Sequence, residues 1–129
     1  MLMIYFAIVT LCLASRISAR PPPAFVQSAV IYNTQKLPIQ CYVVRSHPYG
    51  RLLKYRSFTI RENEYRLLKE VILNMGTWTS YAPIKKIQCG NLVLTAPFDR
   101  VKSIEKNWEF HIQPDKIVSV GPSSYVANT

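Results

Sequence analysis

The chain has 129 residues and carries 16 Lys and Arg against seven Asp and Glu, a formal net charge of +9. This length supports one hydrophobic core and excludes a second domain of ordinary size. The sequence contains neither an internal repeat of structural period nor a low-complexity tract, so repeat architectures are excluded as well.

The chain begins with an apolar run over residues 1–14, followed by small residues. The run is shorter than the roughly 20 residues that a membrane-spanning helix needs. It predicts a signal peptide over 1–19, cleaved after Ala19 or alternatively after Ala14. A short membrane anchor and a buried helix are the alternatives. We therefore expect a secreted, extracellular protein with no transmembrane segment in the mature chain; entry into host cells after secretion is left open.

The mature chain keeps two cysteines, Cys41 and Cys89, because Cys12 lies within the expected signal peptide. An even pair in a small secreted domain predicts one disulfide, with two free buried thiols as the alternative. No third ligand lies nearby, so the pair predicts no zinc site. We expect an extended, proline-containing arm over 20–37 and a folded domain over 38–129.

Strands dominate the first part of the domain. Residues 29–32 are a candidate for a first short strand. Residues 40–45 predict a better strand, because they are rich in β-branched and aromatic side chains. Residues 46–50 contain proline and glycine in the order typical of a turn. Residues 51–58 then predict a returning strand.

One helix is expected, over residues 60–75. Thr59 and Glu62 match the capping-box pattern at its start. Leu68 and Ile72 belong to an apolar face with helical spacing, and a glycine follows the last expected turn.

The pattern after the helix is again that of strands. Trp108, Phe110 and Ile112 alternate with polar residues, which predicts a strand with one buried face. A tight turn at Pro114 separates this strand from the last one. The expected strands are 82–89, 92–95, 108–113 and 116–120. The order predicts a single-domain α+β fold, in which an antiparallel meander packs against one helix.

The positive charge favours a polyanionic partner, with a merely solubilising surface as the alternative. Without Arg16 the mature chain still has 15 Lys and Arg against seven acidic residues, a net charge of +8. Aromatic rings stack on bases and basic side chains hold phosphates, so interleaved residues of both kinds predict RNA binding. Core aromatics flanked by long basic side chains would give the same pattern. The predicted RNA-binding residues are Arg45, Arg51, Lys54, Tyr55, Arg56, Tyr81, Lys85 and Lys86.

Catalytic signatures are sparse, and no metal or cofactor is expected. Glu109 and His111 are two residues apart on an expected strand and project from the same face. A carboxylate beside an imidazole can perform acid–base chemistry on a phosphodiester, with His47 as a further group if folding brings it close. Two exposed strand residues without a function are the alternative.

The order of these elements resembles the ribonuclease-like secreted effectors of powdery mildew fungi, which share the fold of the fungal guanyl-specific ribonucleases. The segments that carry the resemblance are 60–75, 79–83, 95–98 and 108–124. The resemblance implies a microbial ribonuclease-like α+β domain and a monomeric virulence protein that acts in a host.

The catalytic residues of that family do not carry over. Its active members have Tyr-x-His where this chain has Tyr81-Ala82-Pro83, a glutamate where it has Thr95 and a histidine near Ser123. The resemblance therefore implies a non-catalytic effector that binds RNA or a host protein. The alternatives are an active secreted ribonuclease using Glu109 and His111, and a secreted protein-interaction module on another small β-rich scaffold. An extended conformation of residues 60–75 would exclude the ribonuclease-like fold.

Overall fold

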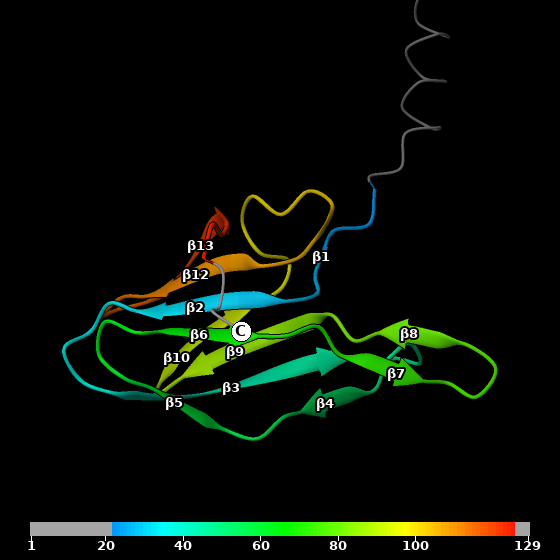
Figure 1. Ribbon diagram of the computed structural model, residues 1–129, viewed down its shortest axis with the longest axis horizontal. Helices are drawn as coiled ribbons and strands as arrows, with labels where there is room; N and C mark the ends of the chain where they lie inside the picture. The colour runs from blue at the N-terminus through cyan, green and yellow to red at the C-terminus, as the bar shows by residue number, and fades with distance from the viewer. Residues whose placement is uncertain (1–21, 126–129) are drawn as a thin grey trace, which may run out of the picture.

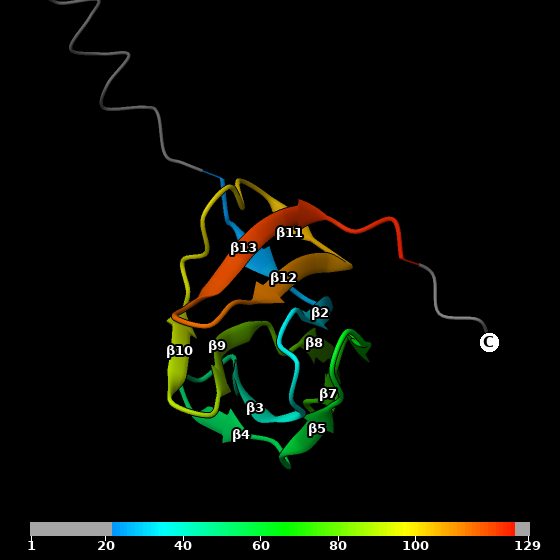
Figure 2. The same cartoon turned by 90° about the vertical axis from the view of Figure 1, so that its left-hand side faces the viewer.

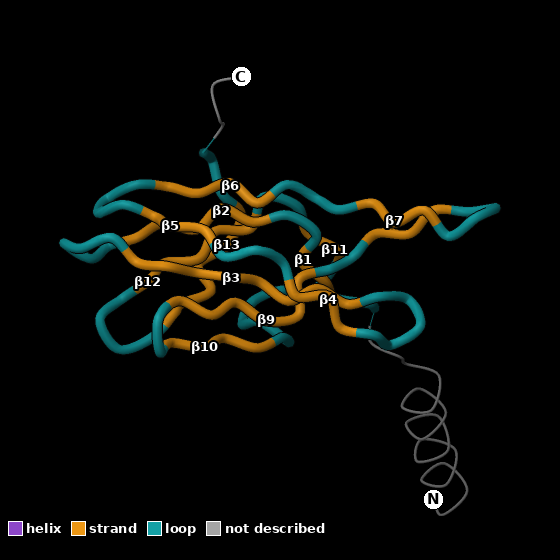
Figure 3. The backbone as a smooth tube through the Cα atoms, turned by 90° about the horizontal axis from the view of Figure 1, so that it is seen from below, coloured by secondary structure: helices purple, strands orange, loops and turns teal. Residues whose placement is uncertain are grey.

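The computed structural model describes residues 22–125, and two β-sheets pack face to face in it. Figure 2 shows the strands of both sheets arranged around a common interior. Strands make up about 52% of the structure, and the described residues contain no helix, as Figure 3 shows. The expected signal peptide, residues 1–19, lies outside the described residues.

The first sheet, here called the β12 sheet, has four strands in the order β13-β12-β2-β6. β12 and β2 run parallel, and the other neighbours are antiparallel. The bounds are β2 Ala29–Asn33, β6 Tyr65–Leu68, β12 Trp108–Ile112 and β13 Ile117–Pro122.

The second sheet, here called the β3 sheet, is antiparallel, with the order β10-β9-β3-β4 and with β5 also paired to β3. Figure 1 shows it as the lower layer, beneath β12 and β2. The bounds are β3 Ile39–Ser46, β4 Leu52–Lys54, β5 Phe58–Ile60, β9 Ile84–Cys89 and β10 Leu92–Thr95.

Two smaller pairings lie at one end of the molecule. β1 (Phe25–Val26) runs parallel to β11 (Ile104–Glu105). β7 (Ile72–Asn74) and β8 (Thr79–Tyr81) form an antiparallel hairpin that projects from the body in Figures 1 and 3.

The core lies between the two sheets and follows the alternation of the strands. Trp108, Phe110 and Ile112 are buried as the sequence pattern predicts, and they face Cys41 and Val43 among the buried residues of β3. Burial of side chains of this size is the main source of stability for a chain this short, at about 1.5–3 kcal/mol each.

The predicted Cys41–Cys89 disulfide is confirmed. The two cysteines are direct partners on β3 and β9, with their Cα atoms 4.0 Å apart, and both are fully buried. The bond therefore joins neighbouring strands of one sheet at its inner face.

The predicted α+β fold with a helix over 60–75 is wrong. That segment contains the end of β5, a turn at Arg61–Asn63, β6 and β7. Gly76, expected just past a helix, has φ +97° and instead follows β7 in the hairpin turn.

Asn33 gives the physical reason for this correction. Its side-chain amide donates to the carbonyls of Ile60 (3.0 Å) and Arg61 (3.3 Å), which the first turn of a helix would have used itself. Leu68 packs against the core beside β2. The segment pairs with β2 through β6 and with β3 through the end of β5. This pairing outweighs the modest free energy of local helix propensity and capping.

The ribonuclease-like fold implied by the resemblance is overturned together with the helix on which it depended. The expected arm, residues 20–37, also contains β2, whose Ala29, Val30 and Ile31 are fully buried in the middle of the β12 sheet. Residues 29–33 are therefore part of the folded body.

Candidate nucleic-acid interface

The positive charge of the described chain is concentrated in the β3 sheet. Residues 39–60 and 82–98, which supply all five of its strands, contain six Lys and Arg and no Asp or Glu. The remaining described residues contain eight Lys and Arg and seven acidic residues, so their charges nearly cancel. Uncompensated charge on one sheet creates a positive field over that side of the molecule.

Tyr42 lies at the centre of the outer face of this sheet, between two lysines. Its neighbours Cys41 and Val43 point into the core, so alternation places the half-buried Tyr42 outside. Lys54 Nζ lies 4.4 Å and Lys86 Nζ 5.5 Å from the centroid of the Tyr42 ring. Lys54 comes from β4 and Lys86 from β9, the two strands that flank β3.

Polar groups fix this arrangement. The Tyr42 hydroxyl donates a 2.6 Å hydrogen bond to Oε1 of Gln88 on β9. Gln40 Nε2 donates to Ser57 Oγ at 2.9 Å. A shallow groove of about 530 Å³ runs over the face and is lined by Gln40, Tyr42, Lys54, Tyr55, Arg56, Ser57, Gln88 and Gly90. The groove is therefore lined by one lysine, one arginine and two tyrosines and by no carboxylate, and Lys86 lies next to it at the Tyr42 ring.

Arg45 does not belong to this surface. Its side chain is 2% exposed, and its guanidinium donates to the carbonyls of Gln27 (3.0 Å), Ala82 (2.8 Å) and Lys69 (2.8 Å). Burial lowers the pKa of Arg45, and the electrostatic interaction with nearby Tyr55 partly offsets this shift. The residue ties β3 to three backbone segments, and this removes it from the predicted RNA-binding set.

The structure places the other predicted RNA-binding residues in three regions: the groove, the hollows beside β8 and β9, and the turn after β3. Four of them, Lys54, Tyr55, Arg56 and Lys86, meet around the groove. Lys85 and Tyr81 line two hollows at the other side of β9 and on β8, and Arg51 is exposed just after the turn that ends β3.

Tyr42, Gln40 and Gln88 were missing from the predicted set. A register that pairs Tyr42 with Gln88 across β3 and β9 would have identified them. The cysteine pair already implied that register. If Cys41 lies opposite Cys89 in an antiparallel pair, the next residue, Tyr42, must lie opposite Gln88, the residue before Cys89.

Glu109 and His111 do meet, on the outer face of the β12 sheet. His111 Nε2 lies 2.6 Å from Glu109 Oε2, and Ser123 Oγ donates to Glu109 Oε1 at 2.7 Å. A nucleophilic triad needs the imidazole between the hydroxyl and the acid. Here the carboxylate stands between them, so the arrangement holds the C-terminal segment in place and does not activate the serine.

Tyrosines cover the same face beside this pair. Tyr32 contacts His111 and Tyr65 at centroid distances of 5.4 Å and 4.5 Å, and Tyr125 stacks on Tyr65 at 4.6 Å. Desolvation by these neighbours, followed by the charge of Glu109, raises the pKa of Tyr65. The rings lie against one another, although Tyr65 and Tyr125 each remain 40% exposed.

His47 does not join Glu109 and His111. It lies in the turn after β3, where its Nδ1 accepts from the backbone of Tyr49 at 3.2 Å, and it lines a hollow beside β8. The three residues of the predicted catalytic alternative are thus divided between two sites.

Within residues 22–125, no group of three His, Cys, Asp or Glu side chains is placed to hold a metal ion. None of the described elements is a helix of the length and apolarity required to cross a bilayer. Comparison of the chain with protein-family models, curated proteins and solved structures found no match.

Proposed function

We propose that the protein is a secreted, non-enzymatic binding protein that holds single-stranded RNA on the outer face of its β3 sheet. The observation that carries this proposal is the charge distribution: the segments of that sheet contain no acidic residue and five basic residues besides the buried Arg45, and two of these, Lys54 and Lys86, lie near the Tyr42 ring.

The chemistry of the groove suits a single strand. Lys54 and Arg56 line the groove and Lys86 lies beside it, so successive phosphates of a strand laid across β4, β3 and β9 can each meet a basic side chain. Tyr42 supplies aromatic surface, on which bases stack without demanding a sequence. Tyr55 also lines the groove, but it packs against the core beside Arg45. Gln40 offers its Oε1 acceptor to base edges or the ribose hydroxyl, since its Nε2 donates to Ser57 and the Gln88 amide bonds Tyr42 and Gly90.

Cleavage is not part of the proposal. Hydrolysis through the ribose 2′-hydroxyl needs a general base and a general acid at the scissile phosphate. The groove has no carboxylate or imidazole among its lining residues. We therefore expect intact RNA after prolonged incubation with the protein, and cleavage that disappears in His111→Ala would overturn this part of the proposal.

The binding test compares two variants of equal net charge. Lys54→Glu with Lys86→Glu changes the groove, whereas Lys36→Glu with Lys116→Glu changes two exposed lysines outside the β3 sheet. Fluorescence anisotropy with a labelled single-stranded RNA should show a loss of at least tenfold for the first pair and a much smaller loss for the second. Each lost phosphate contact should also lower the salt slope by about 0.7. Equal losses for both pairs would contradict a localised site.

A further comparison separates RNA from other polyanions. Tyr42→Ala should weaken RNA binding several-fold, because it removes a stacking surface worth about 1–3 kcal/mol. The same variant should leave heparin binding unchanged, since heparin has no bases. If heparin and RNA respond equally to Tyr42→Ala, the surface recognises charge alone.

A further inference from the structure

The β7–β8 hairpin carries no charged side chain. Residues 71–84 contain no Lys, Arg, Asp or Glu, although the whole chain has a net charge of +9. Ile72, Trp78 and Tyr81 are 56%, 46% and 40% exposed. Natural proteins protect an exposed strand edge with lysine, proline or a cover. This hairpin lacks the charged form of protection, so its edges are open to another chain.

The outer edge of β8 has backbone groups free for pairing. β8 pairs only with β7 among the described strands. Hydrogen bonds from Met75 N to Trp78 O and from Ala82 N to Val71 O, both 2.9 Å, fix the alternation of the ladder. In an antiparallel pair the intervening residues point their N–H and C=O groups away from the partner strand. Thr79 and Tyr81 therefore present theirs at the open edge, where the Tyr81 carbonyl also accepts a 3.2 Å hydrogen bond from the Ser80 hydroxyl.

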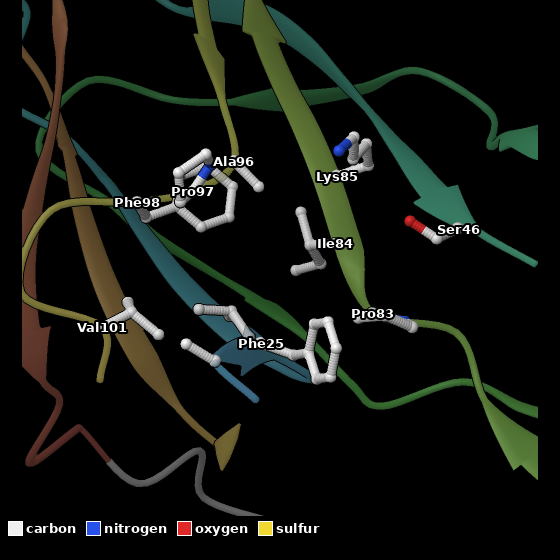
Figure 4. Close-up of a pocket in the computed structure, with 11 residues that line it drawn as sticks. Phe25, Ser46, Pro83, Ile84, Lys85, Ala96, Pro97, Phe98 and Val101 are labelled. Carbon is white, nitrogen blue, oxygen red and sulfur yellow. The ribbon is translucent and has the colours of Figure 1, made fainter. Parts of the chain in front are cut away.

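A hollow of about 400 Å³ lies beside this strand. It is lined by Phe25, Gln27, Ser46, His47, Pro48, Ser80, Tyr81, Pro83 and Ile104. Phe25 and Ile104, from the β1–β11 pairing, are 46% and 51% exposed. A second hollow of about 210 Å³ shares Phe25, Ser46 and Pro83 with the first. Figure 4 shows the residues that line this second hollow. Apolar hollows beside an open strand edge are what binding by strand addition requires.

The charges at the rim of these hollows are positive. Lys85, which lines the smaller hollow, is the one Lys or Arg that lines either of them, and no Asp or Glu lines either. Lys106 Nζ lies 5.4 Å from the centroid of the Tyr81 ring and 3.0 Å from Glu70 Oε2, so the nearby carboxylate is already paired. An acidic occupant would be complementary to this rim. A second copy would bring two chains of high positive charge together, which their repulsion opposes.

The geometry points to a site for an extended, acidic segment of a partner protein, which adds as a third strand to the open edge of β8. Its backbone pairs with Thr79 and Tyr81. Alternate apolar side chains enter the hollow over Phe25 and Ile104, and its carboxylates approach Lys85. This site lies apart from the RNA-binding groove, because the two share no lining residue.

The test uses the full mature protein and a synthetic heptapeptide, Glu-Val-Thr-Val-Thr-Val-Glu, as the probe. Backbone NMR should show the largest shifts and new amide protection at residues 79–81. A peptide with lysine at both ends should bind at least fivefold more weakly, and Lys85→Glu should reverse that preference. Equal binding of the two peptides, or shifts confined to the hairpin tip, would overturn the proposal.

Two further measurements test the strand-addition geometry. Thr79→Pro removes a donor on the open edge of β8 and should abolish peptide binding, whereas Ile72→Pro removes one on the far edge of β7 and should not. If Thr79→Pro misfolds, N-methylation of alternate peptide amides tests the same pairing with the protein unchanged. One methylation pattern should abolish binding and the other should not. Insensitivity to both patterns, or sedimentation showing dimers formed through β8, would contradict the proposed partner.

Discussion

The two sheets of this protein bury similar inner faces but differ at their outer ones. The β3 sheet exposes lysine, arginine and glutamine around Tyr42, with no carboxylate in its segments. The β12 sheet carries Glu109 paired to both His111 and Ser123, beside a row of tyrosines that contact one another. The basic residues of the β3 sheet have no acidic partner within that sheet, whereas the Glu109 carboxylate of the β12 sheet is already hydrogen-bonded.

This difference shows where a high net charge acts. A net charge by itself says only that polyanions are attracted. Because the excess basic residues are concentrated in the β3 sheet, that sheet is where a polyanion is expected to bind. The β12 sheet serves as the comparison surface on the same molecule. The interiors differ as well, since the β3 sheet contains both the disulfide and the buried Arg45.

The largest effect is expected from removing the covalent link of the β3 sheet. Cys41→Ala with Cys89→Ala opens a loop with a sequence separation of 48 residues. The chain-entropy model gives a stability loss of about 4 kcal/mol for such a loop. Urea unfolding measures the loss. The parent protein should lose a similar amount on adding a reductant, and the double variant should not respond; a loss below about 1 kcal/mol would contradict the expectation.

Arg45→Met tests whether the two sheets are joined through a basic side chain. The variant leaves two buried carbonyls and one partly buried carbonyl without their donor, and each buried group costs about 1–3 kcal/mol. We expect a total loss of about 3 kcal/mol in urea unfolding, because relaxation recovers part of that cost. Arg51→Met, at an exposed position, is the matched control and should change stability by less than about 0.5 kcal/mol. Similar values for both variants would show that burial of Arg45 has no energetic role.

Glu109→Gln breaks the balance of the β12 sheet. It weakens the bonds to His111 and Ser123, and we expect a loss of about 1 kcal/mol in thermal unfolding. The change also adds one unit of positive charge to the protein. RNA affinity should stay within about twofold of the parent at physiological salt, because exposed charges beyond about 8 Å are screened. A larger gain in affinity would mean that RNA contacts both sheets.

The smallest effect is expected for Tyr65→Phe, and only at alkaline pH. The pKa of Tyr65 is raised above its ordinary value of 10.0 in the folded protein, so the folded state holds a proton that the unfolded chain loses first. Stability therefore falls as pH rises from about 10 through the higher folded value. The phenylalanine variant should show a shallower fall above pH 10 and the same stability as the parent at pH 7. Parallel curves for the two proteins would contradict this assignment.

Most of the strands could be predicted because their evidence is local. The alternation of Trp108, Phe110 and Ile112 specifies a strand with one buried face whatever its partner. The same holds for the turn at 46–50, where Gly50 has φ +86° and donates to the carbonyl of His47 at 2.8 Å. The predicted strand over 51–58 is interrupted, since β4 ends at Lys54 and β5 begins at Phe58.

The candidate site was only partly predictable, because strand register decides it. Lys54 and Lys86 lie 32 positions apart in the sequence, yet both are opposite Val44 and reach the same tyrosine ring. Arg45 is one residue further along β3 and points to the interior. A shift of one residue in register would exchange these roles, because successive side chains of a strand face opposite sides of the sheet.

By itself, the sequence determined the composition of the molecule: a basic chain, a cysteine pair able to cross-link, and strands whose buried faces follow their alternation. Only the tertiary structure decided the conformation of residues 60–75. Their local pattern suits a helix, but the amide of Asn33 and the pairing with β2 take the backbone groups that a helix would use. Local propensities are worth tenths of a kcal/mol per residue, whereas a buried strand left unpaired costs several, so the distant partner prevails.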